Sequence, residues 1–421
     1  MKILFPLFSL LFLFSCTRQS QKDHSPEIIS MQIIDRNGFS ETISSKERLK
    51  ALDKIDFKKP QPYEKVMRVY GDGSQTNFSS IITSYHENGE VHEYLEIKDG
   101  RARGIFQKRF PNGNLNIEAT IIEGMPDITE TAMASWVFDG ISSIWNEDGA
   151  LIATIPYNKG FLDKSSLYFH TNGLLAKEIP YEKNLICGEV KLYAKDGTLI
   201  ELHNYRLGKR EGKSYKYALN GELLAEEFYK NDLLLEGTYQ NKIAGIIKGE
   251  GVRAEFDGDN LTLLIEYKNG LVDGAVKRFN ETGVCTGSFT LKNGAKNGEE
   301  WEYYNPESGA LPEKKLYLYW KADAIQEAKT WYQNGAKQSQ ITLHGGKKHG
   351  LSCAWYIDGS IMFIEEYTSG KLKSGSYYKK NNPIKVSKVE NGDGKVTLFD
   401  ESGHLTEEIS YERGEPLPKG Y

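Results

Sequence analysis

The residue types that could carry out chemistry are scattered along this sequence and form no recognised catalytic or metal-binding spacing. Its eight histidines include no His-Glu-x-x-His pair, and no Cys/His cluster of the kind that binds zinc occurs. Residues 345–350 are glycine-rich like a phosphate loop, but Leu351 stands where such a loop needs its lysine. We therefore expect no catalytic residues, no metal and no cofactor, and a chain that is not an enzyme.

Pairs of acidic residues are the remaining candidates for acid–base chemistry. They are Glu226-Glu227, Glu365-Glu366 and Glu407-Glu408, which share one phase of a repeat that runs through the chain. Recurrence favours a solvated strand face over a single tuned acid–base pair. An envelope glycan hydrolase with two facing carboxylates from different repeats stays as an alternative, because a sequence does not place carboxylates across a fold.

Cys16 is the cysteine with the clearest chemical context. Residues 3–14 form an apolar run after Lys2 that is too short to span a bilayer stably, as in a secretion signal. The stretch Leu13-Phe14-Ser15-Cys16 is similar to a bacterial lipobox, which implies lipidation of Cys16 and two-chain anchoring to a membrane. We expect a lipoprotein signal peptide over residues 1–16 and a flexible tether over 17–26. A plain signal peptide cleaved nearby is the alternative.

The other three cysteines, Cys187, Cys285 and Cys353, lie at different phases of the repeat and include no Cys-x-x-Cys. We expect them to be small residues in strands. A single disulfide stays open if the compartment is oxidising.

The segments between these residues are organised by glycines that recur about every 24 residues. The reference set is Gly89, Gly113, Gly149, Gly173, Gly197, Gly221, Gly283, Gly309, Gly335, Gly359 and Gly403. A second turn glycine follows each reference, and Asn184 and Asp232 replace it where it is missing. These residue types tolerate positive φ, so the pattern indicates turns and not ligand contacts. His86 and His170 lie just before reference glycines, and we expect them at the solvated surface.

Short extended segments lie between the turns, with aromatic residues at fixed phases. Turn, strand, turn and strand in each repeat predict a β-hairpin. Because a lone hairpin is marginal in water, the hairpins should stack into one elongated antiparallel sheet whose aligned rings hold it together. The fold class expected is all-β, a single-sheet hairpin array. The aromatic content of 12% beside a mean hydropathy of −0.52 fits thin sheets with wet faces.

A sequence pattern, Tyr-x-x-Gly-x-x-x-Gly-x-x-x-x-Tyr-x-x-x-Gly, occurs at residues 205–221, 267–274 and 343–359. This pattern resembles the MORN-repeat variant of the YwqK-type antitoxin-repeat family. Residues 57–70 and 81–89 are similar to repeat lipoproteins of chlamydia-type bacteria. The resemblance implies a MORN-like solenoid that acts as a binding scaffold, and it brings no catalytic residue. An antitoxin-like inhibitor of a partner toxin is the function that the family label implies as an alternative.

The domain organisation follows from where the repeats stop and where they are interrupted. We expect a small α+β cap over residues 27–78, with a capping box formed by Ser44 and Glu47 before a short helix. Residues 79–421 should hold the repeats. The insertions are expected near residues 125–140, 235–256, 310–330 and 376–392.

These expectations define a non-catalytic bacterial envelope lipoprotein, lipid-anchored and facing the periplasm or the cell surface. Its partner would be a protein or an envelope glycan, and the net charge of −5 gives no attraction to nucleic acid. Irregular segments often carry the binding face of a solenoid. The candidate partner-binding residues are Trp136, Phe138, Tyr317, Tyr319 and Trp320.

Overall fold

The computed structural model describes residues 27–71, 78–240, 244–305 and 312–418. Within them the chain is almost entirely β, with 34 strands in one antiparallel sheet and two short helices. The expected all-β hairpin array is therefore confirmed. Contacts divide the chain into two compact units, Met1–Phe161 and Leu162–Tyr421, and each is described by itself.

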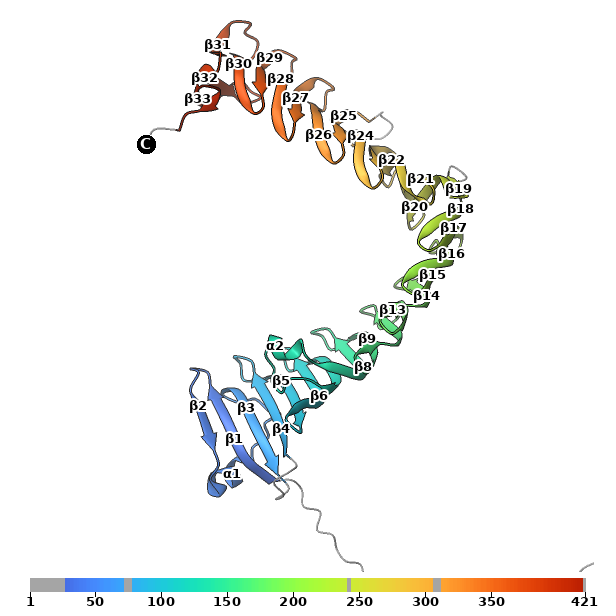
Figure 1. Cartoon of the computed structure of the whole chain (residues 1–421), viewed down its shortest axis with the longest axis vertical. Helices are drawn as coiled ribbons and strands as arrows, with labels where there is room; N and C mark the ends of the chain where they lie inside the picture. Colours follow the sequence, from blue (N-terminus) through green and yellow to red (C-terminus); the bar gives the residue numbers. More distant parts are fainter. Residues whose placement is uncertain (1–26, 72–77, 241–243, 306–311, 419–421) are drawn as a thin grey trace, which may run out of the picture. The chain divides into compact units, whose positions relative to one another are not determined.

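The first unit contains both helices and the strands drawn from blue to green in Figure 1. Its elements are β1 (Glu27–Asp35), β2 (Ser40–Ile43), α1 (Lys46–Leu52), β3 (Tyr63–Gly71), β4 (Phe78–Tyr85), β5 (Val91–Lys98), β6 (Arg101–Arg109), β7 (Leu115–Glu123), α2 (Glu130–Met133), β8 (Val137–Trp145) and β9 (Leu151–Asn158). The strands pair antiparallel in the order β2-β1-β3-β4-β5-β6-β7-β8-β9.

The region expected as a cap contributes β1, β2, α1 and β3, and β3 pairs with the first repeat strand, β4. The helix α1 begins after Ser45, whose hydroxyl accepts a hydrogen bond from the Arg48 amide at 3.3 Å. The expected capping box at Ser44 is therefore wrong by one residue. Which serine caps the helix depends on the residue at which the chain leaves β2. The periodicity of the sequence does not determine that residue.

Residues 125–140 interrupt the first unit with the one-turn helix α2. Thr129 caps it and accepts from the Ala132 amide at 3.3 Å. Trp136 follows α2, is 8% exposed, and packs on Phe106 with ring centroids 4.9 Å apart. The interruption therefore adds apolar side chains to the core of its unit.

The second unit begins within β10 and continues as one hairpin after another. Its strands are β10 (Phe161–Leu162), β11 (Lys164–Phe169), β12 (Leu175–Glu182), β13 (Leu185–Ile186), β14 (Gly188–Tyr193), β15 (Leu199–Arg206), β16 (Lys209–Tyr217), β17 (Leu223–Lys230), β18 (Leu233–Tyr239), β19 (Gly245–Ile247), β20 (Glu250–Asp257), β21 (Asn260–Lys268), β22 (Leu271–Phe279), β23 (Cys285–Lys292), β24 (Ala295–Tyr303), β25 (Lys314–Lys321), β26 (Ala324–Trp331), β27 (Lys337–His344), β28 (Lys347–Trp355), β29 (Ile361–Thr368), β30 (Lys371–Tyr378), β31 (Lys385–Glu390), β32 (Asp393–Phe399), β33 (Leu405–Glu412) and β34 (Glu415–Pro416). From β14 to β34 each strand pairs antiparallel with the next. Residues 314–331, which lie in a segment expected as an insertion, form the ordinary hairpin β25–β26.

Two kinds of turn alternate along the array. The reference glycines within the described residues have positive φ, as Gly221 does at +85° in the turn between β16 and β17. Gly309 lies outside the described residues. At the second kind both central residues have positive φ, as in Leu207-Gly208 at +51° and +80°, which matches the right-handed twist of the flanking strands. Asn184 and Asp232, which replace the second glycine, have φ of +70° and +69°. The prediction that Asn184 and Asp232 replace glycine because the turn needs positive φ is confirmed.

At several repeats the polar tip of a ring side chain ties one repeat to the next. His170 Nε2 lies 2.9 Å from the Tyr193 carbonyl oxygen, and the Tyr332 hydroxyl donates to the Trp355 carbonyl oxygen at 2.9 Å. In the first unit His86 makes the same contact with the Arg109 carbonyl oxygen at 2.9 Å. Contrary to the expectation of solvated surface residues, His86 and His170 are half-buried links between repeats.

The second unit contains two corners in which main chain from three segments meets. In the first corner the Leu234 amide donates to the Gly270 carbonyl, the Gly270 amide to the Gly249 carbonyl, and the Gly249 amide to the Leu235 carbonyl. The second corner repeats the same three bonds with Leu372, Gly414, Gly392 and Lys373. Each corner has its own cluster of buried apolar residues around Leu234 or Leu372, both of which are 0% exposed.

Neither α1 nor α2 has the length and apolarity that crossing a bilayer requires. Cys187, Cys285 and Cys353 are unpaired and half-buried, so they do not form the disulfide that the sequence left open. Cys16, residues 1–16 and the tether over 17–26 lie outside the described residues.

Candidate functional site

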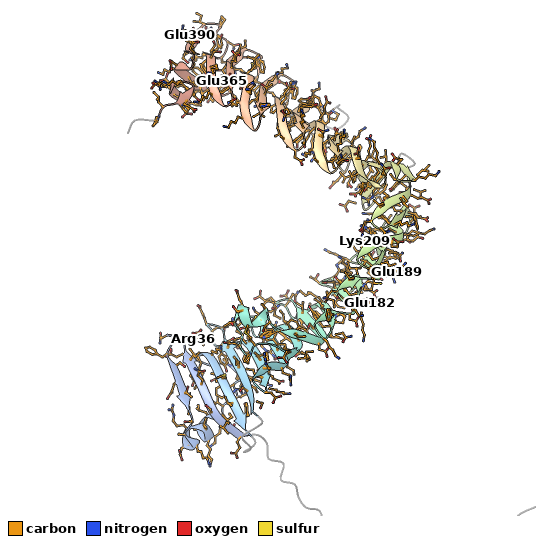
Figure 2. The ribbon with its side chains drawn as sticks, viewed as in Figure 1. Arg36, Glu182, Glu189, Lys209, Glu365 and Glu390 are labelled. Atoms are coloured by element: carbon orange, nitrogen blue, oxygen red, sulfur yellow. The ribbon has the colours of Figure 1, made fainter. Side chains whose placement is uncertain are left out.

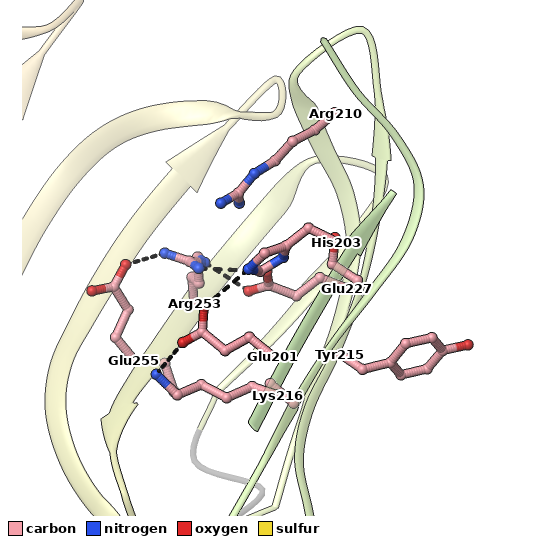
Figure 3. A pocket seen from close by; sticks show the side chains of 11 residues that line it. Glu201, His203, Arg210, Tyr215, Lys216, Glu227, Arg253 and Glu255 are labelled. Atoms are coloured by element: carbon pink, nitrogen blue, oxygen red, sulfur yellow. Dashed lines mark hydrogen bonds and ion pairs between the residues drawn. The ribbon is translucent and has the colours of Figure 1, made fainter. Parts of the chain in front are cut away.

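The first corner borders a pocket of about 230 Å³, seen in Figure 3. Strands β15, β16, β17 and β20 supply its walls. The lining residues are Glu201, His203, Arg210, Ser214, Tyr215, Lys216, Ala225, Glu227, Arg253, Ala254 and Glu255. In Figure 3 the ring of Tyr215 points away from the other labelled side chains, so the polar groups of the pocket come from the remaining residues.

Glu227 is the buried acid of this site, with 5% of its surface exposed. Its carboxylate accepts hydrogen bonds from the hydroxyls of Tyr229 at 2.8 Å and Tyr239 at 2.9 Å, and from Arg253 Nε at 2.6 Å. Arg253 also pairs with Glu255. A buried carboxylate with a guanidinium and two hydroxyl donors satisfies the requirement that buried charge be paired.

These partners set the protonation state of Glu227. Burial by itself would raise the pKa of this carboxyl, but the charge and hydrogen bonds of Arg253, with the two tyrosines, lower the pKa overall. Burial raises the pKa of Tyr239, and the neighbouring carboxylate adds to the effect. Glu227 therefore stays ionised and acts as an acceptor, while the tyrosine stays protonated and donates.

The local sequence explains why Tyr239 reaches Glu227. The residue two positions before it on the same strand face is Gly237, and a Cβ there would lie 2.6 Å from the Tyr239 hydroxyl. Only a residue without a side chain lets the ring lie back along its own strand. The hydroxyl then crosses to β17, where Glu227 is located.

Glu201 is the second carboxylate of the pocket, and it is paired on two sides. His203 Nε2 lies 3.0 Å from Glu201 Oε2, and Lys216 Nζ lies 2.9 Å from Oε1. The hydrogen bond from His203, with that from Lys216, lowers the pKa of Glu201 to about 2. Because an ionised carboxylate only accepts, His203 Nε2 must carry the proton of this contact.

Arg210 is a half-buried cation whose contacts are hydroxyls and an aromatic face. Its Nη1 donates to the Tyr229 hydroxyl at 3.1 Å, its Nε to the Tyr205 hydroxyl at 3.4 Å, and its Cζ lies 5.0 Å from the Tyr229 ring centre. Within the described residues no carboxylate forms an ion pair with it. Of its five N–H donors, those on the outer edge of the guanidinium are left for another acceptor.

The second corner repeats the core of this arrangement with different surroundings. Glu365 is 5% exposed and accepts from Tyr367 at 3.1 Å and from Tyr377 at 2.9 Å, while Gly375 stands two residues before Tyr377 as Gly237 does before Tyr239. Figure 2 labels Glu365 within the last hairpins of the chain. Lys348 takes the place of Arg210, with its ammonium 4.7 Å from the Tyr367 ring centre and 3.9 Å from Glu365.

The two corners differ in what fills the space beside the glutamate. In the first corner Ala225 pairs with Tyr239 across the hairpin. At the same register position of the second corner Phe363 pairs with Tyr377, and the two rings pack with centroids 6.3 Å apart. In the first corner Arg253 pairs with Ile265. The equivalent residue of the second corner is Val396, which pairs with Ile409 and is 3% exposed. The first corner is thus the open copy with an arginine beside its glutamate, and the second is the copy in which Phe363 and Val396 fill these places.

Sequence reasoning missed Glu227 and Glu365, which it placed on a solvated strand face. Both are buried, so that expectation is wrong. A signal was present in the sequence: each glutamate stands two residues before a tyrosine, and a Gly-x-Tyr follows on the next strand. Glu226 and Glu366, their neighbours in the acidic pairs, are exposed or half-exposed as expected.

Trp136 and Phe138, two of the expected partner-binding residues, lie in the first unit. Their rings meet edge to face with centroids 6.5 Å apart, and Trp136 Nε1 donates to the Met125 carbonyl oxygen at 3.0 Å. Both belong to the packed cluster around Phe106. A partner would therefore meet at most the half-buried Phe138.

The other three expected binding residues lie on β25 in the second unit and do not form one group. Tyr317 is 9% exposed and packs on Trp301 with centroids 4.6 Å apart. Trp320 donates to the buried Glu300 at 2.7 Å. Tyr319 is 43% exposed and is the one that a partner could reach most fully. Within the described residues no group of three or more His, Cys, Asp and Glu side chains is arranged to hold a metal.

Two stretches of the chain, residues 210–231 and 392–413, match the family model of the MORN repeat variant. The first of them contains Arg210, Glu227 and Tyr229. No curated protein matches the sequence. A solved structure described as "Crystal Structure of TcdB2-TccC3 without hypervariable C-terminal region" is similar over 87% of this chain at 12% identity, with a TM-score of 0.11. The chain spans 25% of that structure's length, and a likeness of this degree carries no argument. The repeat matches and the open hairpin sheet fit a non-catalytic binding scaffold.

Proposed function

We propose that this protein is a non-catalytic scaffold of the bacterial cell envelope, held to a membrane by lipid on Cys16, whose hairpin repeats bind a protein or an envelope glycan. The observation that carries the proposal is the single open sheet. Its side chains project from both faces of the hairpins within each unit, as Figure 2 shows. A sheet built in this way offers long rows of side chains to a partner without needing a cleft.

The chemistry of the first corner supports a binding role over hydrolysis. Glu201 and Glu227 both have a lowered pKa, which keeps them ionised at neutral pH. A glycosidase needs a carboxyl group that is protonated near the working pH, so a raised pKa is required of its general acid. The two carboxylates instead serve as partners for Lys216 and Arg253.

The anchor is tested by metabolic labelling with a fatty acid analogue and by fractionation of the envelope. We expect the label to stay on the wild-type chain in the membrane fraction, and Cys16→Ser to lose both the label and the membrane association. A labelled Cys16→Ser chain, or an unlabelled wild type in the soluble fraction, would rule the anchor out.

The partner surface is tested by crosslinking in the native envelope followed by mass spectrometry. Tyr319→Ala removes an exposed ring from β25, and Leu351→Ser, at a residue 56% exposed on β28, is a control of similar exposure. We expect Tyr319→Ala to lose partners that Leu351→Ser retains. Identical partner sets for wild type and Tyr319→Ala would remove Tyr319 from the binding surface.

A further inference from the structure

A comparison of the two corners of the second unit shows that one cation, Arg210, lacks the carboxylate partner that its counterpart has. In the second corner the cation at the tyrosine face, Lys348, has Glu365 as its carboxylate partner. In the first corner Arg253 enters from β20 and takes the equivalent carboxylate, Glu227. Arg210 keeps its position over the Tyr229 ring but loses its carboxylate.

Each of the three carboxylates around the first corner has a partner within the corner. Glu201 is paired with Lys216 and His203, while Glu227 and Glu255 are both paired with Arg253. Arg210 is the one cation of the pocket lining that no carboxylate contacts within the described residues, so its guanidinium can take an anionic partner. Since a guanidinium in a half-buried site is weakly hydrated and planar, it favours a planar carboxylate held by two parallel N–H···O bonds.

The pocket also contains polar groups that lack partners. Ser214 is 2% exposed, and its hydroxyl has no hydrogen-bond partner among the described residues. His203 Nδ1 is likewise buried without a partner in the described structure. Because Nε2 donates to Glu201, Nδ1 of a neutral imidazole has a lone pair that can accept. Groups of this kind are normally satisfied, and an occupant that carries hydroxyls would satisfy them.

The space for an occupant results from one small residue. Ala225 borders the pocket where Phe363 fills the second corner. The resulting volume of about 230 Å³ admits a carboxylate with a short polar body, and not a folded partner.

We propose that the first corner is a binding site for a small monocarboxylate that carries hydroxyl groups, such as an acidic sugar, with its carboxylate on the outer edge of Arg210 and its body beside Ala225. This site is separate from the anchor and from the partner surface proposed above. Loss of either of those leaves it unaffected.

The test uses saturation-transfer NMR on the purified full chain, with glucuronate, propionate and glucose as observed probes and inorganic phosphate, which has no carbon-bound protons, as a competitor. We expect transfer to glucuronate, weaker transfer to propionate, and competition between the two. Phosphate and glucose should neither bind nor compete, because the former carries more charge than Arg210 balances and the latter carries none. Displacement of both carboxylates by an equal concentration of phosphate would overturn the proposal.

Four variants locate the site. Arg210→Gln and Ala225→Phe should each weaken glucuronate binding at least tenfold, the first by removing the cation and the second by filling the pocket as Phe363 fills its copy. Arg210→Lys should bind with intermediate strength. Lys348→Gln, in the second corner, should bind as the wild type does. Circular dichroism melting confirms that each variant is folded. Wild-type binding by folded Arg210→Gln and Ala225→Phe would refute the assignment.

Discussion

Tyr239 donates a hydrogen bond of 2.9 Å to Oε1 of Glu227, and it does so across the hairpin formed by β17 and β18. Both side chains are buried. The second corner contains the same bond, from Tyr377 to Oε1 of Glu365, again at 2.9 Å. A buried carboxylate that accepts from tyrosine hydroxyls is therefore part of how this chain builds a corner, and an arginine is added to it in one of the two copies.

Tyr239→Phe should destabilise the first corner. The change keeps the ring but leaves one oxygen of a buried carboxylate with one donor fewer, and hydrogen bonds to charged groups contribute about 1.5–3 kcal/mol each. Hydrogen exchange of the β17 and β18 amides measures the local free energy of opening. Tyr168→Phe is the control, since the Tyr168 hydroxyl makes no hydrogen bond within the described residues. Equal protection in the two variants would contradict the role of the bond.

Arg253→Met should be more costly than any single tyrosine change. It leaves Glu227 ionised and buried without its guanidinium, and breaking a buried ion pair costs about 3–5 kcal/mol. The double variant Glu227→Gln with Arg253→Met should recover part of the loss, because the buried charge is then gone. Denaturant unfolding followed by tyrosine fluorescence measures both. A double variant less stable than Arg253→Met would show that charge burial is not the cause.

Gly251→Ala tests the main-chain packing of the first corner. The new Cβ would overlap the Gly245 carbonyl oxygen, and the residue has φ of +135°. Gly173→Ala separates the cost of the backbone conformation from the cost of the steric overlap. Gly173 has φ of +83°, and no atom lies within 4 Å of a Cβ placed on it. We expect about 1 kcal/mol for Gly173→Ala from backbone conformation alone and more than about 3 kcal/mol for Gly251→Ala. Thermal melting of the two variants side by side makes the comparison.

The stability of the second unit should depend on pH through Glu201. Its folded pKa of about 2 lies below the ordinary value of 4.5, so the unfolded state binds protons first as the pH falls. The contribution of Glu201 is therefore complete above about pH 4.5 and is lost between pH 4.5 and pH 2. After allowance for partial solvent screening we expect about 2 kcal/mol at neutral pH.

Glu201→Gln is the variant that measures this contribution. Its stability deficit relative to the wild type should be present at pH 7 and vanish as the pH approaches 2. Glu189→Gln, at a half-exposed residue paired with Lys191 and labelled in Figure 2, should change stability by less than about 0.5 kcal/mol. A Glu201→Gln deficit that does not change with pH would mean that the carboxylate contributes through packing and not through charge.

The backbone of this protein was more predictable than its polar interior. Asn184 and Asp232 indicated positive φ because few residue types accept it, and that constraint is local. The burial of Glu227 depends on Arg253, which lies three strands further along the chain, and on the absence of a side chain at Gly237. No periodic pattern reports such a combination. His86 shows the same limit, because its carbonyl partner Arg109 belongs to the next repeat.

The corner bonds between Leu234, Gly249 and Gly270 have a mechanical consequence. Where each hairpin is bonded only to its neighbours, a pull on one end of the second unit would peel strands away one after another, each at a small force. At a corner the main chain is tied beyond the adjacent strand, so several bonds must break together before peeling continues. The two corners would therefore act as stops that divide an extending array into segments of unequal resistance.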